Sequence, residues 1–350
     1  MNTTKLFKVS LLVFGLLILA AFIFTLDPKE IVYIISSLSS PAKTIIATVG
    51  VTLISILFKS YRWRLLIFKI TNTKTSLWFS FQAVLAGIAA GSFIPGRIEL
   101  ARPLVYNQRH NIPITKSLSA LIIERALDLL CFVLFLLVGL LLIPSQKIIS
   151  LNIVIIILSL ISFCILSAII FPKKILNIIK KITNYIPLPL KFKEKTIAFI
   201  EQSIMSFTIF HSKKTILNIA FLSFITNILE FVRVYILLSA FEISVSIPII
   251  LTILSAGILL GVLSAIPGGI GVTEFSSASI LTTLAPNILP AMAKSIILLD
   301  RVISYYIIII LGALCLIHLG YFTKIEPPSQ PNQKDQLKED LIKDTTSEKS

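Results

Sequence analysis

The chain contains several apolar runs that are long enough to cross a membrane, and this feature limits its fold most. A transmembrane helix needs about 20 consecutive apolar residues. Hydrophobic residues make up 56% of the 350 residues and charged residues only 14%, against about a quarter charged in a soluble domain. We predict an all-α polytopic integral membrane protein. About six full transmembrane helices are expected, at residues 6–26, 42–58, 117–143, 151–171, 215–240 and 296–320.

Two Ile-Pro-Gly motifs interrupt the other apolar runs. Residues 92–99 read Ser-Phe-Ile-Pro-Gly-Arg-Ile-Glu, and residues 264–274 read Ser-Ala-Ile-Pro-Gly-Gly-Ile-Gly-Val-Thr-Glu. Proline removes a backbone donor, and freed backbone groups survive at membrane depth only inside protein or beside a polar cavity. We interpret each motif as the turn of a re-entrant helical hairpin, with a full span as the alternative. The hairpins comprise 77–94 with 98–106, and 249–266 with 275–290.

The basic residues predict the orientation. The formal net charge is +15, and residues 173–214 carry nine lysines against two glutamates. Because cytoplasmic loops are enriched in Lys and Arg, we place this segment and both termini in the cytoplasm. The positive charge is expected to set the topology and to attract anionic lipid rather than to bind nucleic acid. Residues 173–214 form either an interfacial helical segment or a solvated loop. One membrane domain covers 1–322, and the polar tail 323–350 is expected to be disordered.

The two halves of the chain resemble each other beyond these motifs. Pro95 is followed 29 residues later by Glu124-Arg125, and Pro267 is followed 33 residues later by Asp300-Arg301. Under the predicted topology the two hairpins enter from opposite faces of the membrane. Inverted repeats of this kind surround a midplane substrate site in many transporters, so we predict one here.

Several charged residues fall inside the predicted spans. An ionised group there costs a few kcal/mol, so these side chains are expected to face the bundle interior and pair. Glu124 and Asp128 share a helix face, and Glu230 can pair with Arg233 three residues later. The intramembrane polar and structural residues that we single out are Pro95, Gly96, Glu99, Glu124, Asp128, Glu230, Arg233, Pro267, Gly271, Glu274 and Asp300.

Arginines beside broken helices suit a phosphate ligand. A guanidinium offers two parallel donors, and a half-helix that starts after Pro-Gly offers free N–H groups. The predicted lipid-phosphate ligands are Arg97, Arg125, Arg301, Gly268 and Gly269. The alternative is that the arginines only neutralise buried acids. Glu99 and Glu274 are expected to cap the following half-helices, although an acid–base role is the other interpretation.

No catalytic or metal-binding pattern accompanies these residues. The sequence has no GxSxG, HExxH or P-loop motif, its three histidines are scattered, and its three cysteines lie in apolar runs. We therefore expect no metal, no cofactor and no enzymatic activity.

The motifs Ile-Pro-Gly-Arg-Ile-Glu, Ile-Ile-Glu-Arg-Ala-Leu-Asp and Pro-Gly-Gly-Ile-Gly-Val-Thr-Glu together resemble the lysylphosphatidylglycerol synthase transmembrane region, also called the UPF0104 or flippase-like family. The resemblance covers about 5–322 and implies a plasma-membrane fold with two re-entrant hairpins. Members of this family move aminoacylated phosphatidylglycerol, and others accompany cell-surface glycan assembly, which implies anionic phospholipid or polyprenyl-phosphate glycolipid as substrate. Ile98 stands where many members have a small residue. Only about 28 polar residues follow the membrane region, so lipid aminoacylation is not expected.

These observations favour a lipid translocase in the cell membrane. One alternative is a membrane enzyme that acts on a lipid-linked sugar through Glu99 or Glu274. Another is a scaffold for glycosyltransferases. Membrane lipids are the expected partners, and a homo-oligomer is compatible with the sequence.

Overall fold

A computed structural model describes residues 40–93, 99–143 and 213–319, with isolated positions between 156 and 174. The described residues are helical, and no strand occurs among them. Within these ranges four helices are long and apolar enough to cross a membrane, which confirms the all-α membrane class. They are α3 (Pro41–Thr71), α6 (Ile114–Leu142), α10 (Lys213–Ala240), and the continuous run of α13 (Pro290–Arg301), η3 (Val302–Tyr306) and α14 (Ile307–His318).

One predicted boundary is wrong by a wide margin. The span predicted at 42–58 continues as α3 to Thr71. Lys59 and Arg62 therefore lie within the helix rather than after it, and Arg62 is completely buried in ion pairs next to the core residue Trp63. The helix therefore continues because its charged side chains find partners inside the protein. The predicted spans 6–26 and 151–171 lie outside the described residues, apart from a few isolated positions.

Four shorter helices form two pairs. The first pair is α4 (Leu77–Gly91) and α5 (Ala101–His110), and the second is α11 (Ile247–Leu263) and α12 (Val272–Leu284). At 1.5 Å per residue α4 is about 23 Å long and α11 about 26 Å, less than the roughly 30 Å hydrocarbon core. The members of each pair pack against each other. No bilayer is present, so re-entrance itself stays a prediction.

The second Ile-Pro-Gly break is a tight turn that requires glycine. Pro267 starts a short 3-10 turn, η2 (Pro267–Gly269), and α12 begins only after Gly271. Gly268, Gly269 and Gly271 have φ angles of 66°, 60° and 81°, values that residues with a Cβ rarely adopt. The predicted break is thus confirmed at this motif. In the first motif, Pro95, Gly96 and Arg97 lie outside the described residues.

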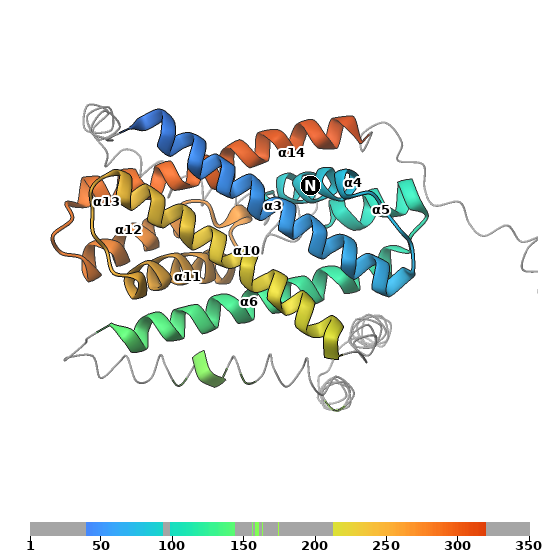
Figure 1. The fold of residues 1–350 in the computed structure, drawn as a ribbon, viewed down its shortest axis with the longest axis horizontal. Coiled ribbons are helices and arrows are strands. Elements are labelled where there is room, and N and C mark those ends of the chain that lie inside the picture. The colour runs from blue at the N-terminus through green and yellow to red at the C-terminus, as the bar shows by residue number, and fades with distance from the viewer. Residues whose placement is uncertain are drawn as a thin grey trace, which may run out of the picture.

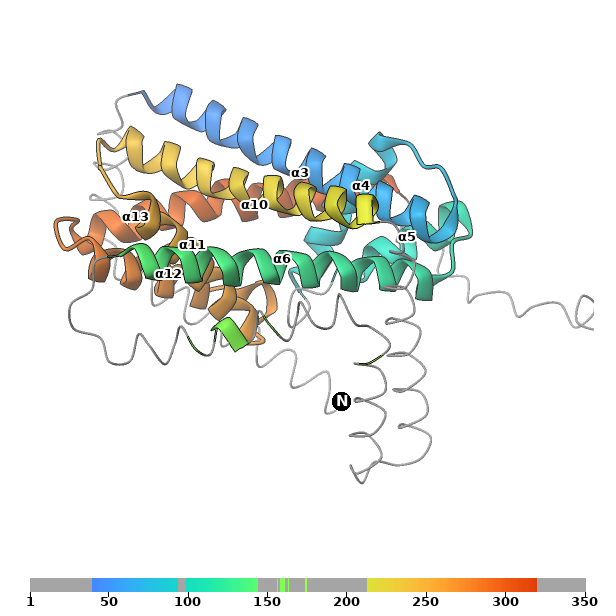
Figure 2. The same cartoon turned by 60° about the horizontal axis from the view of Figure 1, so that its bottom comes forward.

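The halves are interlocked through their helix pairs. Helices α3 and α10 lie side by side and run in opposite directions (Figures 1 and 2). Helix α4 packs against α14 of the second half, whereas α11 packs against α6 of the first half. Figure 1 shows α4 with α5 towards one end of the bundle and α11 with α12 towards the other. This exchange is what the predicted inverted repeat would produce.

One end of the bundle is strongly basic. It contains the ends of α3, α5 and α14 and the starts of α4, α6 and α10 (Figure 2). We call it the basic end; its exposed basic residues include Lys69, Lys74, Arg109, Lys116 and Lys214. At the opposite end lie Lys43, Lys294 and the acidic Glu242. The positive-inside rule would place the basic end in the cytoplasm.

Candidate functional site

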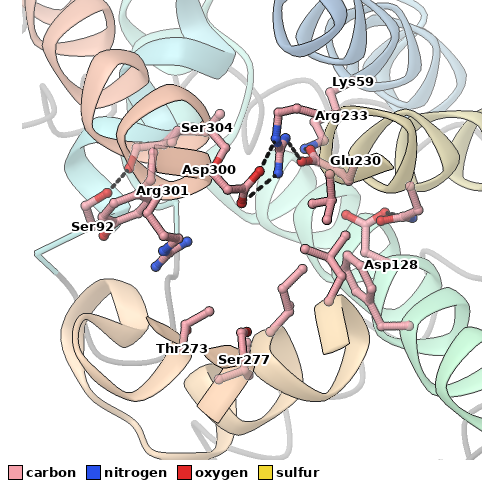
Figure 3. Close-up of a pocket in the computed structure, with 18 of the residues that line it drawn as sticks. Lys59, Ser92, Asp128, Glu230, Arg233, Thr273, Ser277, Asp300, Arg301 and Ser304 are labelled. Atoms are coloured by element: carbon pink, nitrogen blue, oxygen red, sulfur yellow. Dashed lines mark hydrogen bonds and ion pairs between the residues drawn. The ribbon is translucent and has the colours of Figure 1, made fainter. Parts of the chain in front are cut away.

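A cavity of about 360 Å³ lies between the two halves, and we call it the central cavity. Figure 3 shows Arg233, Glu230 and Asp300 on one side of it, and Thr273 and Ser277 on the other. Charged and apolar residues thus share one space. Its apolar lining residues are Ile88, Leu129, Phe132, Val234, Ile253, Leu254, Ile258, Val262 and Ile297.

The acid that follows each Ile-Pro-Gly motif binds an arginine in the long helix after it. Oε1 of Glu99 lies 2.6 Å from Nη2 of Arg125, and Oε1 of Glu274 lies 2.8 Å from Nε of Arg301. The residues of these pairs are 26 and 27 positions apart in the sequence. The two pairs are therefore equivalent contacts in the two halves.

The acid next to each arginine completes a second equivalent pair. Glu124 lies 3.0 Å from Arg62 of α3, and Asp300 lies 2.7 Å from Arg233 of α10. In both halves the acid–arginine dipeptide is thus held between the first long helix and the segment after the break. This repetition supports the predicted inverted repeat independently of the Pro-Gly motifs.

A further ion pair joins the two halves directly. Nζ of Lys59 in α3 lies 2.8 Å from Oε1 of Glu230 in α10, and Glu230 also pairs with Arg233, as its spacing predicts. Lys59 and Arg62 occupy the same three-residue spacing in α3 as Glu230 and Arg233 in α10. Sequence reasoning missed Lys59 and Arg62, although this matching spacing is a signal that could have identified them.

Arg102 is a further member of the network that the sequence did not indicate. It is completely buried, and its Nη1 donates to both carboxylate oxygens of Glu124 at 2.9 and 3.1 Å. It also pairs with Glu99, and its guanidinium lies 5.2 Å from the ring centre of Trp63. Gly87 leaves room for it, since a Cβ there would lie 2.4 Å from Cγ of Arg102.

Asp128 shares the helix face of Glu124, as predicted, and both contact Arg62. The Asp128 carboxylate accepts two bonds from Arg62, at 2.6 and 3.0 Å. Nη1 of Arg62 also donates to Oγ of Ser223 at 2.7 Å. Both Nη groups of Arg62 are therefore engaged by protein groups, which indicates a structural role.

The prediction that Glu99 and Glu274 cap half-helices is wrong. Among the described residues, the hydrogen-bond partner of the Glu99 carboxylate is Arg125 and that of the Glu274 carboxylate is Arg301, not a backbone N–H of α5 or α12. A charge-assisted bond to guanidinium is roughly twice as strong as a neutral one, which explains the preference. The sequence was interpreted as favouring capping over an acid–base role, and it did not indicate these arginines as partners.

The predicted phosphate ligands differ in how accessible they are. The Arg125 side chain is 38% exposed and lines the central cavity, whereas the Arg301 side chain is only 8% exposed. The Arg301 guanidinium lies 4.5 Å from the Tyr305 ring centre, and its Nη2 donates to the Gly268 carbonyl at 3.4 Å. The N–H of Gly269 is not free, because it donates to the Ile266 carbonyl at 2.9 Å.

A π-helical turn follows directly after the second acid–arginine dipeptide. Helix η3 begins at Val302, and Tyr305 within it lines the central cavity. Turns of this kind occur mostly as single insertions in α-helices, frequently at functional sites. Here the turn joins α13 to α14 beside Arg301.

The charges of this network balance. Among the described residues its ion pairs involve six basic and six acidic side chains. They are Lys59, Arg62, Arg102, Arg125, Arg233 and Arg301, with Glu99, Glu124, Asp128, Glu230, Glu274 and Asp300. A phosphate group in the central cavity would therefore compete with a carboxylate for its arginine. In the described part of the chain, no three His, Cys, Asp or Glu residues are grouped to hold a metal ion.

The sequence model of the lysylphosphatidylglycerol synthase TM region matches residues 11–312, which include every residue of the ion-pair network. The chain belongs to this family. A UPF0104 membrane protein of Methanothermobacter thermautotrophicus is 30% identical over 246 residues, covering 67% of this chain and 72% of that protein. Another from Methanocaldococcus jannaschii is 27% identical over 294 residues, covering 80% of this chain and 85% of that protein.

Proposed function

We propose that this member of the lysylphosphatidylglycerol synthase TM region family translocates a phosphate-bearing lipid, a phospholipid or a lipid-linked glycan, across the cell membrane. The observation that carries the proposal is the central cavity, in which Arg125 and Arg301 come from equivalent positions of two interlocked halves. A site shared by two inverted halves can open to either face by a similar motion of each half.

The mixed lining of the central cavity suits an amphipathic substrate. The ionic groups offer a polar site for a head group. Side chains of α6 and α11, among them Phe132 and Ile253, offer an apolar surface for the lipid chain. A soluble ion would not need the apolar part, and a purely apolar molecule would not need the charges.

Arg125 is the residue most suited to make the first contact with a phosphate. It is the most exposed arginine of the network, and Glu99 keeps a second partner in Arg102 when Arg125 turns away. An incoming phosphate can therefore replace Glu99 on Arg125 without leaving that carboxylate unpaired. Burial of an unpaired charge costs several kcal/mol, so this second partner lowers the energy needed for binding.

An enzymatic role is less well supported by the same contacts. Glu274 is completely buried and bonded to Arg301, and Glu99 is bonded to two arginines. Both carboxylates thus already bind protein groups, and Glu274 does not line the central cavity. A scaffold protein would have no need for a cavity lined by charged groups.

Transport is tested with purified protein in liposomes that contain a fluorescent phospholipid, whose movement between leaflets is read by chemical quenching from outside. Wild-type protein should accelerate this movement. The double variant Pro267→Leu/Gly268→Ala should abolish it, because a Cβ at Gly268 would lie 1.7 Å from Oη of Tyr305 and its φ of 66° disfavours alanine. Gly50→Ala is the control, since its Cβ would meet nothing within 4 Å.

Equal rates in protein-containing and empty liposomes, for both a phospholipid and a polyprenyl-phosphate probe, would overturn the proposal. Product analysis of the same liposomes tests the enzymatic alternative, because a new lipid species would appear only if the protein performs chemistry.

A further inference from the structure

A second cavity of about 420 Å³ lies at the basic end, away from the ion-pair network. Four of its nine lining residues are basic or titratable, and none is acidic. The four are Lys74, Arg109, His110 and His318, and the others are Thr75, Ser76, Phe79, Gln82 and Leu319. We call it the basic-end cavity. In contrast to the central cavity, its cationic groups have no carboxylate among the lining residues.

Three separate parts of the chain bring these basic groups together. Lys74 precedes α4, Arg109 and His110 end α5, and His318 ends α14. Nη2 of Arg109 donates to the Leu319 carbonyl at 3.1 Å, which ties α5 to the end of α14. Two of the four groups are thus fixed by packing or hydrogen bonding, because the His110 ring also lies edge-on to Phe79 at 4.7 Å.

An exposed tryptophan indicates the depth of this cavity in the membrane. Trp78 is 66% exposed and stacks on Phe81, with ring centres 5.6 Å apart. Exposed tryptophan in membrane proteins is enriched at the head-group level. Trp78 lies four residues after Lys74 in the sequence, so the basic-end cavity is expected at the same level as lipid phosphates.

Topology alone does not explain this convergence of basic groups. The positive-inside rule requires basic residues at the cytoplasmic ends of helices, and Lys69 and Lys116 at the same end satisfy it while lying outside the cavity lining. The positive-inside rule does not require that basic groups from three segments line one cavity.

We propose that the basic-end cavity binds a phosphate group, supplied by the head group of an anionic lipid or by a soluble phosphate. The hydroxyl and amide side chains of Thr75, Ser76 and Gln82 in the lining add neutral hydrogen-bonding groups to the basic ones. This site is separate from the central cavity and does not depend on transport.

The test compares two variants that each lose two positive charges at the same end of the molecule. Lys74→Gln/Arg109→Gln removes charges from the cavity, and Lys69→Gln/Lys116→Gln removes exposed charges outside it. Each protein is placed in nanodiscs of phosphatidylcholine, with or without a minority of phosphatidylglycerol, and its thermal unfolding is followed at physiological salt. A ligand that binds only the folded state raises its stability.

We expect phosphatidylglycerol to stabilise the wild type and the Lys69/Lys116 variant, and to bind the cavity variant about 30-fold more weakly. Lys74→Gln alone should weaken binding about 5-fold, and it guards against a packing defect because it leaves the Arg109–Leu319 bond intact. Inorganic phosphate added to phosphatidylcholine nanodiscs identifies a soluble source if it stabilises the wild type instead. Equal responses of the two double-charge variants, or no response of the wild type to either probe, would refute the site.

The imidazole of His110 gives the site a pH dependence. His110 is the last residue of α5 and lies outside the candidate spans, and burial lowers the pKa of its imidazole below the ordinary value. It is therefore neutral at pH 7 and gains charge on acidification, beside the cationic Lys74 and Arg109 and the second imidazole of His318. Affinity for phosphatidylglycerol, whose phosphodiester stays anionic, should rise as the pH falls from 7 towards the lowered pKa of His110. His110→Gln should flatten this rise, while Lys69→Gln/Lys116→Gln should leave it unchanged.

Discussion

The pair of Arg301 and Glu274 offers the sharpest test of whether an arginine of the network is a ligand or only a structural partner. Their side chains are 8% and 0% exposed, and a single 2.8 Å bond joins them. Arg301→Gln would leave the Glu274 charge buried without its partner, which typically costs about 3–5 kcal/mol. Arg301→Gln/Glu274→Gln removes both charges and should recover most of that loss. Asp300 is not the partner to change, because it pairs with Arg233.

The equivalent arginine of the first half provides an internal comparison. Arg125 is 38% exposed, and Glu99 retains Arg102 when Arg125 is replaced. Arg125→Gln should therefore cost only about 1 kcal/mol, the value typical of an exposed ion pair. The structure thus predicts that Arg301→Gln destabilises the protein far more than Arg125→Gln, although both arginines follow an acid in the same acid–arginine pattern of the sequence.

Denaturant unfolding in detergent measures the stability of each variant, and lipid movement in liposomes measures its function. A ligand role predicts that Arg301→Gln/Glu274→Gln folds but does not transport, and that Arg301→Lys folds with reduced transport because lysine lacks the bidentate fork. Wild-type transport by the double variant would show that Arg301 does not bind the head group. A single variant as stable as the wild type, or a double variant no more stable than the single one, would refute the buried ion pair.

Two further predictions concern packing and orientation. Gly87→Ala should destabilise the protein by about 1–3 kcal/mol, because its Cβ would lie 2.4 Å from Cγ of Arg102. Gly50→Ala should be neutral or slightly stabilising, because its Cβ would meet nothing within 4 Å. Thermal unfolding of the two variants checks both expectations. With the native cysteines replaced, an impermeant maleimide added outside intact cells should label a cysteine at Lys43 and spare one at Lys116. The reverse pattern would invert the orientation.

The break at Pro267 was predictable because its cause is local. Proline and the following glycines are visible in the sequence, and the positive φ angles at Gly268, Gly269 and Gly271 are what such residues permit. The pairing of Glu230 with Arg233 was equally accessible, since a spacing of three residues places both on one helix face.

The burial of Lys59, Arg62 and Arg102 was not predictable from local sequence. A basic residue near the end of an apolar run is usually interfacial, and the partner acids of Arg62 lie more than 60 positions away. Only three-dimensional packing, of α3 against α6 and α10 and of α5 against α6, brings these groups to their partners. The same limit explains why Glu99 was assigned to capping, although its sequence distance from Arg125 nearly equals that between Glu274 and Arg301.

The exchange of helix pairs between the halves constrains the order in which the protein can fold. Helix α4 packs against α14, whose residues are synthesised more than 200 positions later. At about 5–20 residues per second, α4 waits roughly 10–40 s for its final neighbour. During that interval the face of α4 that includes Leu85 and Ala89, which lie next to Gly312 of α14, has no native cover from α14. Assembly of the first half is therefore completed only when the end of the second half emerges, so a chain interrupted before α14 should be a substrate for membrane quality control.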